Sequence, residues 1–383
     1  MKEKIRILQI ISNLETCNGI TSYLLNYYQN IDLNKFQIDF LVCKDMNSDS
    51  QKNFEFLSKN GSHIYYLQQM GIKNMFGALK KMNDFFRKNA SKYDIVHCHM
   101  LNNGAFFLHY AKKYGVRIRI LHSHVTQSAD IILKKIRNDL LIPIAIKNAT
   151  HYFACSEEAG KFIFKKNNFI VINNAINIER FKYNEKIRRN MREKFKIREE
   201  DIVIGNVGRL CPQKNQLFLL DIFKKMNDKK LNLKLIMIGD GPWKYDIQNK
   251  IEKMKLEQNI ILLEPQENIE NFYQMFDLFL FPSRYEGLGI VLIEAQTSGL
   301  KCYASDVIPT RAQITENYYV QSLEDSDEEW AEKILEILKD NSQRESKEEN
   351  ARMYGYDIKN EAKKLEKIYI NIYKENNGGK CGK

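Results

Sequence analysis

Short apolar runs alternate with longer amphipathic stretches along the whole chain, and this alternation constrains the fold more than any other feature. The short runs are apolar at successive positions, as expected for strands that are buried on both faces. The stretches between them have the periodicity of helices. A parallel sheet with helices on both of its faces satisfies such a pattern. In the first half of the chain the predicted strands are 5–11, 36–42, 63–67, 94–99, 117–124 and 151–156.

The alternation starts again after residue 201, which predicts a second sheet. A polar, basic stretch separates the two halves, and we interpret it as a partly helical linker. In sheets of this kind, ligands bind at the carboxyl ends of the strands, so a cleft between two such domains is the expected site. The predicted strands of the second half are 202–208, 233–239, 260–263, 278–283 and 301–305. The fold class is therefore α/β, with two Rossmann-like, doubly wound domains at 1–178 and 202–356, a linker at 179–201, and a helix at 357–376 that crosses back to the first domain.

Composition narrows the class of protein. Of the 383 residues, 44% are hydrophobic, which argues against disorder. The longest apolar run, 140–146, is too short to cross a bilayer, and the chain begins without a signal-peptide pattern. The seven cysteines are scattered and form no CxxC pair, as expected of a reduced, cytoplasmic protein. The net charge of +11 suits anionic ligands, but the basic residues are too dispersed for nucleic-acid binding.

An Asp-x-Asp sequence, Asp325 to Asp327, raises the question of a metal site. Ser326 and Glu329 have the spacing of a capping box, and acidic residues are favourable in the first turn of a helix. We therefore interpret this stretch as a helix start and predict no metal ion.

Two glutamates stand on either side of a helix start in RYEGLGIVLIEAQTSG, residues 284–299. Gly287 and Gly289 allow the backbone to approach a ligand closely, and the free N–H groups of a helix start attract anions. The carboxylates of Glu286 and Glu294 would repel an anion, but they accept hydrogen bonds from hydroxyl groups. A ligand with hydroxyl groups at both ends and phosphates between them fits the stretch. A nucleotide diphosphate sugar is such a ligand.

The cations that phosphates require occur in GNVGRLCPQKNQ, residues 205–216. This stretch is another strand-to-helix turn, in which Arg209 follows Gly205 and Gly208, and Lys214 comes five residues later. Arginine can hold two phosphate oxygens at once, and lysine provides a point charge. Each motif alone is weak, since Glu286 could be a solvated loop acid and Arg209 a surface ion pair.

The two motifs together, GRLCPQKN followed by EGLGIVLIEAQ, resemble family 4 of the retaining glycosyltransferases, which have the GT-B fold. ILQIISNLETCNGITSYLLNYY, DIVHCHM, RILHSH, FACSEEAGKFIF and VINNAINIERF extend the resemblance over nearly the whole chain. The most similar subgroup is that of bacterial capsular and exopolysaccharide transferases.

The resemblance implies a role for each matched residue. Arg209 and Lys214 hold the donor diphosphate, Glu294 binds the ribose, and Glu286 binds the transferred sugar. The remaining implied site residues are Gly287, Leu288 and Gly289 beside the sugar, Gly19 near the diphosphate, His124 near the reacting sugar, and His99 and His122 on the acceptor side. From the residues alone, the preferred interpretation of His122 and His124 is that they are buried, hydrogen-bonded histidines.

The implied reaction is transfer of a hexose, with retention, from a nucleotide diphosphate sugar (expected to be a UDP-sugar) to a saccharide acceptor, expected to be lipid-linked. No cofactor or metal is expected. Two alternatives stay open: a non-catalytic partner subunit of another glycosyltransferase, and a nucleotide-sugar epimerase. The segment 133–149 is basic and apolar, so peripheral contact with the inner face of a bacterial membrane is expected, with self-packing of that helix as the alternative.

The chain departs from the family pattern in three places. Asn18 replaces the first glycine of the loop after the first strand, and because asparagine tolerates the left-handed conformation, the loop can survive this change. Ala175 replaces another glycine, and 262–269 lacks the glycine turn that lines the base pocket in the family, so these residues do not fix the base.

Overall fold

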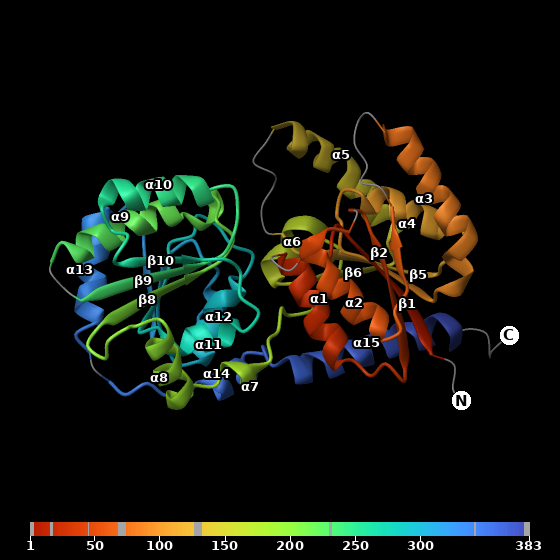
Figure 1. Ribbon diagram of the computed structural model, residues 1–383. Coiled ribbons are helices and arrows are strands. Elements are labelled where there is room, and N and C mark those ends of the chain that lie inside the picture. The colour runs from red at the N-terminus through yellow and green to blue at the C-terminus, as the bar shows by residue number, and fades with distance from the viewer. Residues whose placement is uncertain are drawn as a thin grey trace. The chain divides into compact units, whose positions relative to one another are not determined.

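The chain forms two compact units, each with its own parallel sheet. The computed structural model describes residues 4–15, 18–44, 46–67, 74–125, 132–229, 232–340 and 342–378. Unit 1 consists of Met1–Asn174 together with Ile358–Lys383, and unit 2 is Ala175–Asp357. Figure 1 shows helices on both faces of each sheet. The predicted α/β class with two Rossmann-like domains is confirmed.

Unit 1 has the strand order β3-β2-β1-β4-β5-β6-β7, and its paired strands are parallel. The strands are β1 Ile5–Ile11, β2 Phe36–Val42, β3 Ile64–Tyr66, β4 Ile95–Cys98, β5 Ile118–Ser123, β6 His151–Ala154 and β7 Ile170–Val171. The helices are α1 Gly19–Asn30, α2 Ser48–Lys59, α3 Met75–Asn89, α4 Gly104–Lys113, α5 Ile132–Asn148, α6 Glu157–Phe164 and α15 Ile358–Gly378, with a 3₁₀ turn at Ala90–Lys92.

Unit 2 has the order β10-β9-β8-β11-β12-β13, again with parallel pairs. The strands are β8 Ile202–Val207, β9 Leu233–Ile238, β10 Ile260–Leu263, β11 Leu278–Phe281, β12 Lys301–Ser305 and β13 Tyr318–Gln321. The helices are α7 Ile178–Phe181, α8 Glu185–Lys194, α9 Gln216–Asn227, α10 Lys244–Met254, α11 Ile269–Met275, α12 Ile290–Thr297, α13 Asp327–Ile337 and α14 Glu348–Met353, with 3₁₀ turns at Pro212–Lys214 and Thr310–Ala312.

Alternate residues of a central strand enter two different cores. In β9, Leu235 packs with residues of α9, α10 and α13, whereas Ile236 packs with residues of α7, α11 and α12. Both side chains are fully buried. Because each face of the strand meets apolar helices, apolar residues are required at successive positions, which is the pattern seen in the sequence.

Residues 179–201, which we expected to be a linker, are part of unit 2. Phe181, Met191 and Ile197 enter one of its cores. Arg192 is 6% exposed, and its guanidinium donates to the backbone carbonyls of Met275, Arg198 and Asp201. The stretch looks polar in sequence because all of its charged side chains except Arg192 and Asp201 are exposed or partly exposed, while its few apolar residues enter the core.

The C-terminal helix α15 belongs to unit 1 and packs against α1. Its Leu365, Tyr369 and Ile372 are buried. The Glu366 side chain accepts a 2.8 Å hydrogen bond from the backbone N–H of Asp32, so the helix is tied to the loop after α1. Unit 1 is therefore built from the two ends of the chain.

The Asp-x-Asp stretch starts a helix. At the N-terminus of α13, the Ser326 hydroxyl accepts from the Glu329 N–H, and the Glu329 carboxylate accepts from the Ser326 N–H at 2.8 Å. Asp325 accepts a hydrogen bond from Gln321 at 2.9 Å. The predicted capping box is thus present, and Asp325 also forms a local hydrogen bond.

Candidate active site

Two loops at the carboxyl ends of β8 and β9 lie in direct backbone contact. A Cβ atom on Gly239 would lie 2.0 Å from the Gly208 carbonyl oxygen, and one on Gly241 would lie 2.3 Å from the Leu210 carbonyl oxygen. The Leu210 N–H also donates to the Asp240 carbonyl at 2.9 Å. Glycine is therefore required at 239 and 241 to support the loop that carries Arg209. The sequence analysis did not identify these two glycines.

Arg209 is exposed at the end of β8. Its backbone carbonyl accepts a 2.9 Å hydrogen bond from the buried side-chain amide of Gln216, and the same amide accepts from the Cys211 N–H at 3.3 Å. Among the residues that the structure describes, no carboxylate pairs with the Arg209 guanidinium. The loop is held by its backbone while the cationic group stays available to a ligand.

Lys214 and Glu286 join the loops after β8 and β11. The Lys214 ammonium lies 2.5 Å from the Glu286 carboxylate and 4.8 Å from the centre of the Phe281 ring. The two side chains are 16% and 7% exposed. Backbone contacts support the pair, because Gln213 donates to the Tyr285 carbonyl at 3.0 Å and accepts from the Arg284 N–H at 2.8 Å. The sequence predicted both residues in one site but not that they touch.

The start of α12 has the geometry of an anion-binding turn. Gly289 precedes the helix with a φ of 78°, which favours glycine, and no side chain caps the helix there. The first N–H groups of such a helix have no intrahelical partner. The Leu288 side chain is buried in the core of unit 2, and the preceding Gly287 is partly exposed.

Glu294, one turn further into α12, is held by Tyr273 of α11. The buried Tyr273 hydroxyl donates to the Glu294 carboxylate at 2.8 Å. Burial raises the pKa of the Glu294 carboxyl to about 7, although the Tyr273 hydrogen bond and the Arg180 charge act in the opposite direction. Tyr273 is a third residue that the sequence analysis missed, because it lies 21 positions away from Glu294 in the chain.

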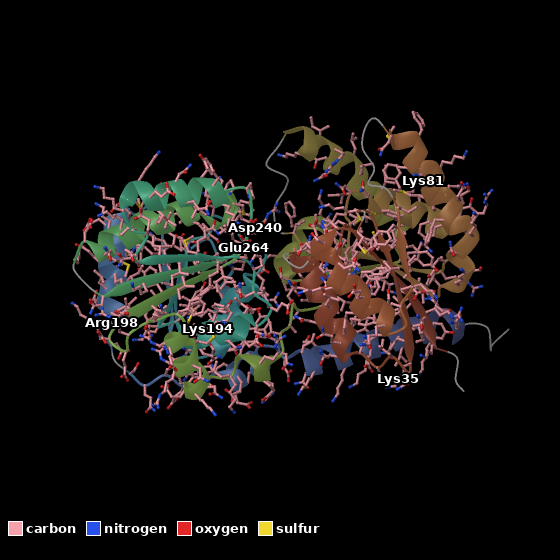
Figure 2. The ribbon with its side chains drawn as sticks, in the orientation of Figure 1. Lys35, Lys81, Lys194, Arg198, Asp240 and Glu264 are labelled. Atoms are coloured by element: carbon pink, nitrogen blue, oxygen red, sulfur yellow. The ribbon has the colours of Figure 1, made fainter. Side chains whose placement is uncertain are left out.

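Two acidic side chains at the same edge of the sheet share one lysine. Figure 2 labels Asp240 and Glu264 in the loops after β9 and β10. Both carboxylates form ion pairs with the ammonium of Lys244, at 3.8 Å in the case of Asp240. One ammonium balances only one of the two carboxylates, so these three side chains keep one net negative charge, although neither carboxylate pairs with the Arg209 guanidinium.

In unit 1, the loop after β1 ends in a capped helix. The Asn18 side chain accepts hydrogen bonds from the N–H groups of Ile20 and Thr21, at 2.9 and 3.2 Å. Its φ is −102°, so Asn18 does not use the left-handed conformation that asparagine tolerates, because it is the N-cap of α1. A Cβ atom on Gly19 would meet nothing within 4 Å, which leaves open space beside it.

The histidines at the ends of β4 and β5 form one buried cluster. His97 and His122 are hydrogen-bonded through ring nitrogens 3.1 Å apart, and His99 and His124 through nitrogens 2.9 Å apart. Burial lowers the pKa of His97, His99 and His122 well below the usual value and that of His124 to about 3. All four imidazoles are therefore neutral at physiological pH.

Nitrogen atoms of His97, His99 and His122 lie within 4.8 Å of one another, a spacing that could admit a metal ion. The rings of His97 and His99 are stacked with centroids 4.3 Å apart. Ring lone pairs lie in the ring plane, so stacked imidazoles do not direct them to one point. The arrangement fits a hydrogen-bond network better than a metal centre.

Comparisons with known proteins agree with this architecture. Residues 187–354 match the family model described as Glycosyl transferases group 1. The chain is 29% identical over 382 residues to the putative glycosyltransferase EpsF of Bacillus subtilis (strain 168), covering 97% of this chain and 98% of that protein. It is 25% identical over 400 residues to an Escherichia coli UDP-Gal:alpha-D-GlcNAc-diphosphoundecaprenol alpha-1,3-galactosyltransferase, covering 97% of both chains.

The fold is shared with solved glycosyltransferases. Anabaena Alr3699/HepE in complex with UDP-glucose superposes with a TM-score of 0.77 at 16% identity, covering 96% of this chain and 100% of that one. The chain is a transferase enzyme with the GT-B fold. It is a glycosyltransferase, which confirms the predicted enzyme class, and residues 187–354 of its second unit match the group 1 model.

Proposed function

We propose that the enzyme transfers a hexose from a nucleotide diphosphate sugar to a saccharide hydroxyl, with retention at the anomeric carbon. The observation that carries the proposal is the ion pair of Lys214 and Glu286, which joins two loops at the carboxyl edge of the second sheet. An ammonium suits the donor diphosphate, and a carboxylate suits the hydroxyl groups of its sugar. In this pair, the ammonium nitrogen and a carboxylate oxygen lie 2.5 Å apart.

In this proposal, catalysis consists of positioning and charge stabilisation. The bond from the anomeric carbon to the phosphate oxygen breaks, and a bond from that carbon to the acceptor oxygen forms on the same face. The departing phosphate oxygen takes the proton of the acceptor hydroxyl. Arg209 and Lys214 stabilise the charge that develops on the leaving diphosphate, and no metal ion or cofactor is required.

Glu294 is proposed to bind the ribose of the donor, oriented by the Tyr273 hydroxyl. We propose a UDP-sugar as donor because one solved structure of this fold contains UDP-glucose and one relative is named for UDP-Gal. That relative is also named for a diphosphoundecaprenol-linked acceptor, and another for amylovoran biosynthesis. We therefore propose a lipid-linked saccharide acceptor and a role in capsule or exopolysaccharide synthesis.

The two carboxylates provide the test of the proposal. Glu294→Gln should weaken binding of both the nucleotide diphosphate and the nucleotide sugar by roughly 10-fold or more, because it removes a charge-assisted hydrogen bond of about 1.5–3 kcal/mol. Glu286→Gln should leave the affinity for the nucleotide diphosphate almost unchanged but impair binding of the nucleotide sugar and its transfer. Calorimetric titration of each variant with both ligands, beside a transfer assay, measures the difference.

Equal weakening of the plain nucleotide diphosphate by both substitutions would contradict this division of roles. Conversion of the nucleotide sugar into its epimer without any acceptor would indicate an epimerase instead. The transfer assay is also run in excess EDTA, where activity is expected to persist. A complete loss that manganese or magnesium restores would contradict a metal-free reaction.

We also propose that α5 rests on a membrane surface next to the acceptor. Ile136, Leu140 and Ile144 follow one another at four-residue intervals and are 52%, 67% and 47% exposed, whereas Ala145 on the other side enters the core. The exposed Lys135, Arg137 and Lys147 add positive charge to the same helix. Apolar and basic side chains on one exposed helix suit an anionic bilayer. No helix among the described residues could cross a membrane.

Vesicle sedimentation tests this contact. The protein should bind vesicles that contain anionic lipid more strongly than neutral vesicles, and Leu140→Ser together with Ile144→Ser should reduce the bound fraction by about fivefold or more, since each removes buried apolar area. Val320→Ser, at a side chain 56% exposed in unit 2, is the matched control and should bind like the wild type. Equal binding by all three proteins would contradict the proposed surface.

A further inference from the structure

Gln9 of β1 connects two chains of hydrogen bonds inside unit 1. Its side-chain oxygen lies 2.8 Å from Nε2 of His99, and Nδ1 of His99 lies 2.9 Å from Nε2 of His124. Gln9 and His99 are buried, whereas His124, just after β5, is partly exposed. This first chain therefore runs from the core to a side chain that solvent can reach.

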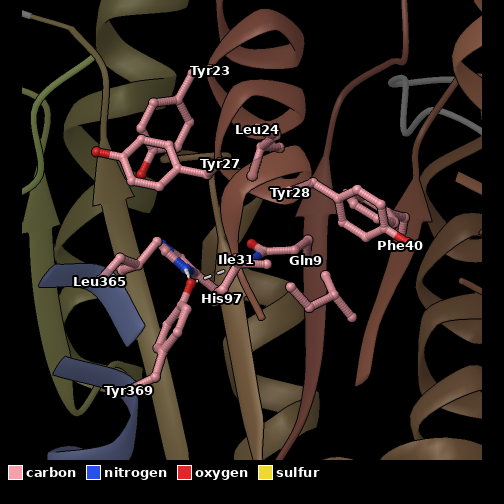
Figure 3. Close-up of a pocket in the computed structure, with 11 residues that line it drawn as sticks. Gln9, Tyr23, Leu24, Tyr27, Tyr28, Ile31, Phe40, His97, Leu365 and Tyr369 are labelled. Carbon is pink, nitrogen blue, oxygen red and sulfur yellow. Dashed lines mark hydrogen bonds between the residues drawn. The ribbon is translucent and has the colours of Figure 1, made fainter. Parts of the chain in front are cut away.

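The second chain starts at the other atom of the same amide. The nitrogen of Gln9 donates to the Tyr369 hydroxyl at 3.3 Å, and this hydroxyl lies 2.7 Å from Nδ1 of His97. Nε2 of His97 lies 3.1 Å from Nδ1 of His122. Figure 3 shows Gln9, His97 and Tyr369 beside a cavity of about 20 Å³, which is room for one water molecule. This second chain ends inside the unit, because His122 is fully buried.

The chemistry of the amide fixes the direction of the first chain. An amide oxygen can only accept, so His99 must donate from Nε2. A neutral imidazole has one N–H group, which leaves Nδ1 of His99 as an acceptor, and His124 must then donate from Nε2. Among the described residues, Nδ1 of His124 has no hydrogen-bond partner and keeps its lone pair.

The second chain has the opposite polarity. The Tyr369 hydroxyl accepts from Gln9 and donates its single proton to Nδ1 of His97. His97 then donates from Nε2 to His122, whose own proton must be on Nε2. That nitrogen is buried and unpartnered among the described residues. The two chains thus differ in function, since only the first reaches a partly exposed side chain.

We propose that Gln9 is a positioning residue that holds His124, through His99, in the Nε2–H tautomer, so that Nδ1 of His124 accepts a hydrogen bond from a substrate hydroxyl. The inference rests on the proposed sugar transfer. A histidine held in this form can orient a sugar hydroxyl, but it supplies no positive charge to the diphosphate. The task of His124 is therefore distinct from that of Arg209 and Lys214.

Two substitutions in the same network separate this role from a merely structural one. Gln9→Met removes the acceptor of the first chain and keeps the side-chain volume. Tyr369→Phe removes the hydroxyl of the second chain and leaves the Gln9 oxygen on His99. Both remove buried hydrogen bonds, so both should lower the midpoint of thermal unfolding. Only Gln9→Met should change the tautomer of His124 and the rate of transfer.

The experiment uses the full-length protein labelled with ¹⁵N in histidine, whose protonated and unprotonated ring nitrogens have well-separated ¹⁵N shifts. His99 and His124 are expected to carry the proton on Nε2 in the wild type and in Tyr369→Phe. In Gln9→Met the His124 signals should indicate mixed tautomers, kcat should fall by about fivefold, and KM for the donor should change little, as expected for one neutral hydrogen bond.

A proton on Nδ1 of His124 in the wild type would overturn the inference, as would wild-type turnover in Gln9→Met. A set of ring signals that shifts together with one equivalent of Zn²⁺ would assign the cluster to a metal instead. The spectra do not depend on activity. If the wild type transferred no sugar, the proposed function would fail, while the tautomer assignment would still be judged on the spectra alone.

Discussion

Replacement of Arg209 by alanine is expected to lower kcat on the order of 100-fold, because a cation that stabilises the leaving diphosphate is comparable to a donor of an oxyanion hole, which contributes about 3 kcal/mol. The side chain is exposed and pairs with no carboxylate among the described residues. Its loss should therefore change the free energy of unfolding by no more than about 0.5 kcal/mol. The kcat of Arg209→Lys should lie between those of the wild type and Arg209→Ala, since lysine keeps the charge but cannot hold two phosphate oxygens at once.

A matched control is available in the same unit. Lys194 is an exposed cation on α8, labelled in Figure 2 apart from the loops that carry Asp240 and Glu264. Lys194→Ala removes the same charge and should transfer sugar at the wild-type rate. Steady-state kinetics with the nucleotide sugar compares the variants. An equal loss in Arg209→Ala and Lys194→Ala would mean that the general positive charge of the protein, rather than Arg209, attracts the donor.

Most strands that the sequence predicted are interior strands buried on both faces, although β3 and β10, at the edges of the two sheets, were also predicted. β1, β2, β10 and β12 have the predicted bounds, because their apolar runs end where the strands end. β13, at the edge of the second sheet, was missed. Its sequence YYVQ mixes buried and exposed positions, and Val320 is 56% exposed. An edge strand has a partner on one side only, so it lacks the continuous apolar pattern of an interior strand.

The sequence predicted the residues of the candidate site but not the contacts between them. The rule that ligands bind at the carboxyl ends of parallel strands brings the loops with Arg209 and Glu286 to one edge of the sheet. It does not reveal that Lys214 and Glu286, 72 positions apart, form a pair. Nor does it reveal Gln9 or Tyr273, whose roles depend on distances across packed elements. Such residues resemble ordinary core residues until the fold is known.

Replacement of Lys214 is expected to have a second effect that Arg209 lacks. Lys214→Ala should lower kcat by about 100-fold or more and should also destabilise unit 2 by about 3 kcal/mol, because it leaves the nearly buried Glu286 carboxylate without its ammonium. Both tryptophans, Trp243 and Trp330, belong to unit 2, so their fluorescence during urea unfolding reports on that unit alone.

The double variant Lys214→Ala/Glu286→Gln separates the two effects. A neutral amide at 286 needs no counter-charge, so the double variant should recover much of the stability that Lys214→Ala loses. Transfer should not recover, because the diphosphate still lacks its ammonium. If the double variant regained the wild-type rate, Lys214 would serve only to neutralise Glu286. The proposal that Lys214 stabilises the leaving diphosphate would then be wrong. If Lys214→Ala unfolded at the wild-type urea concentration, the pair would contribute no stability, and Lys214 would act on the donor alone.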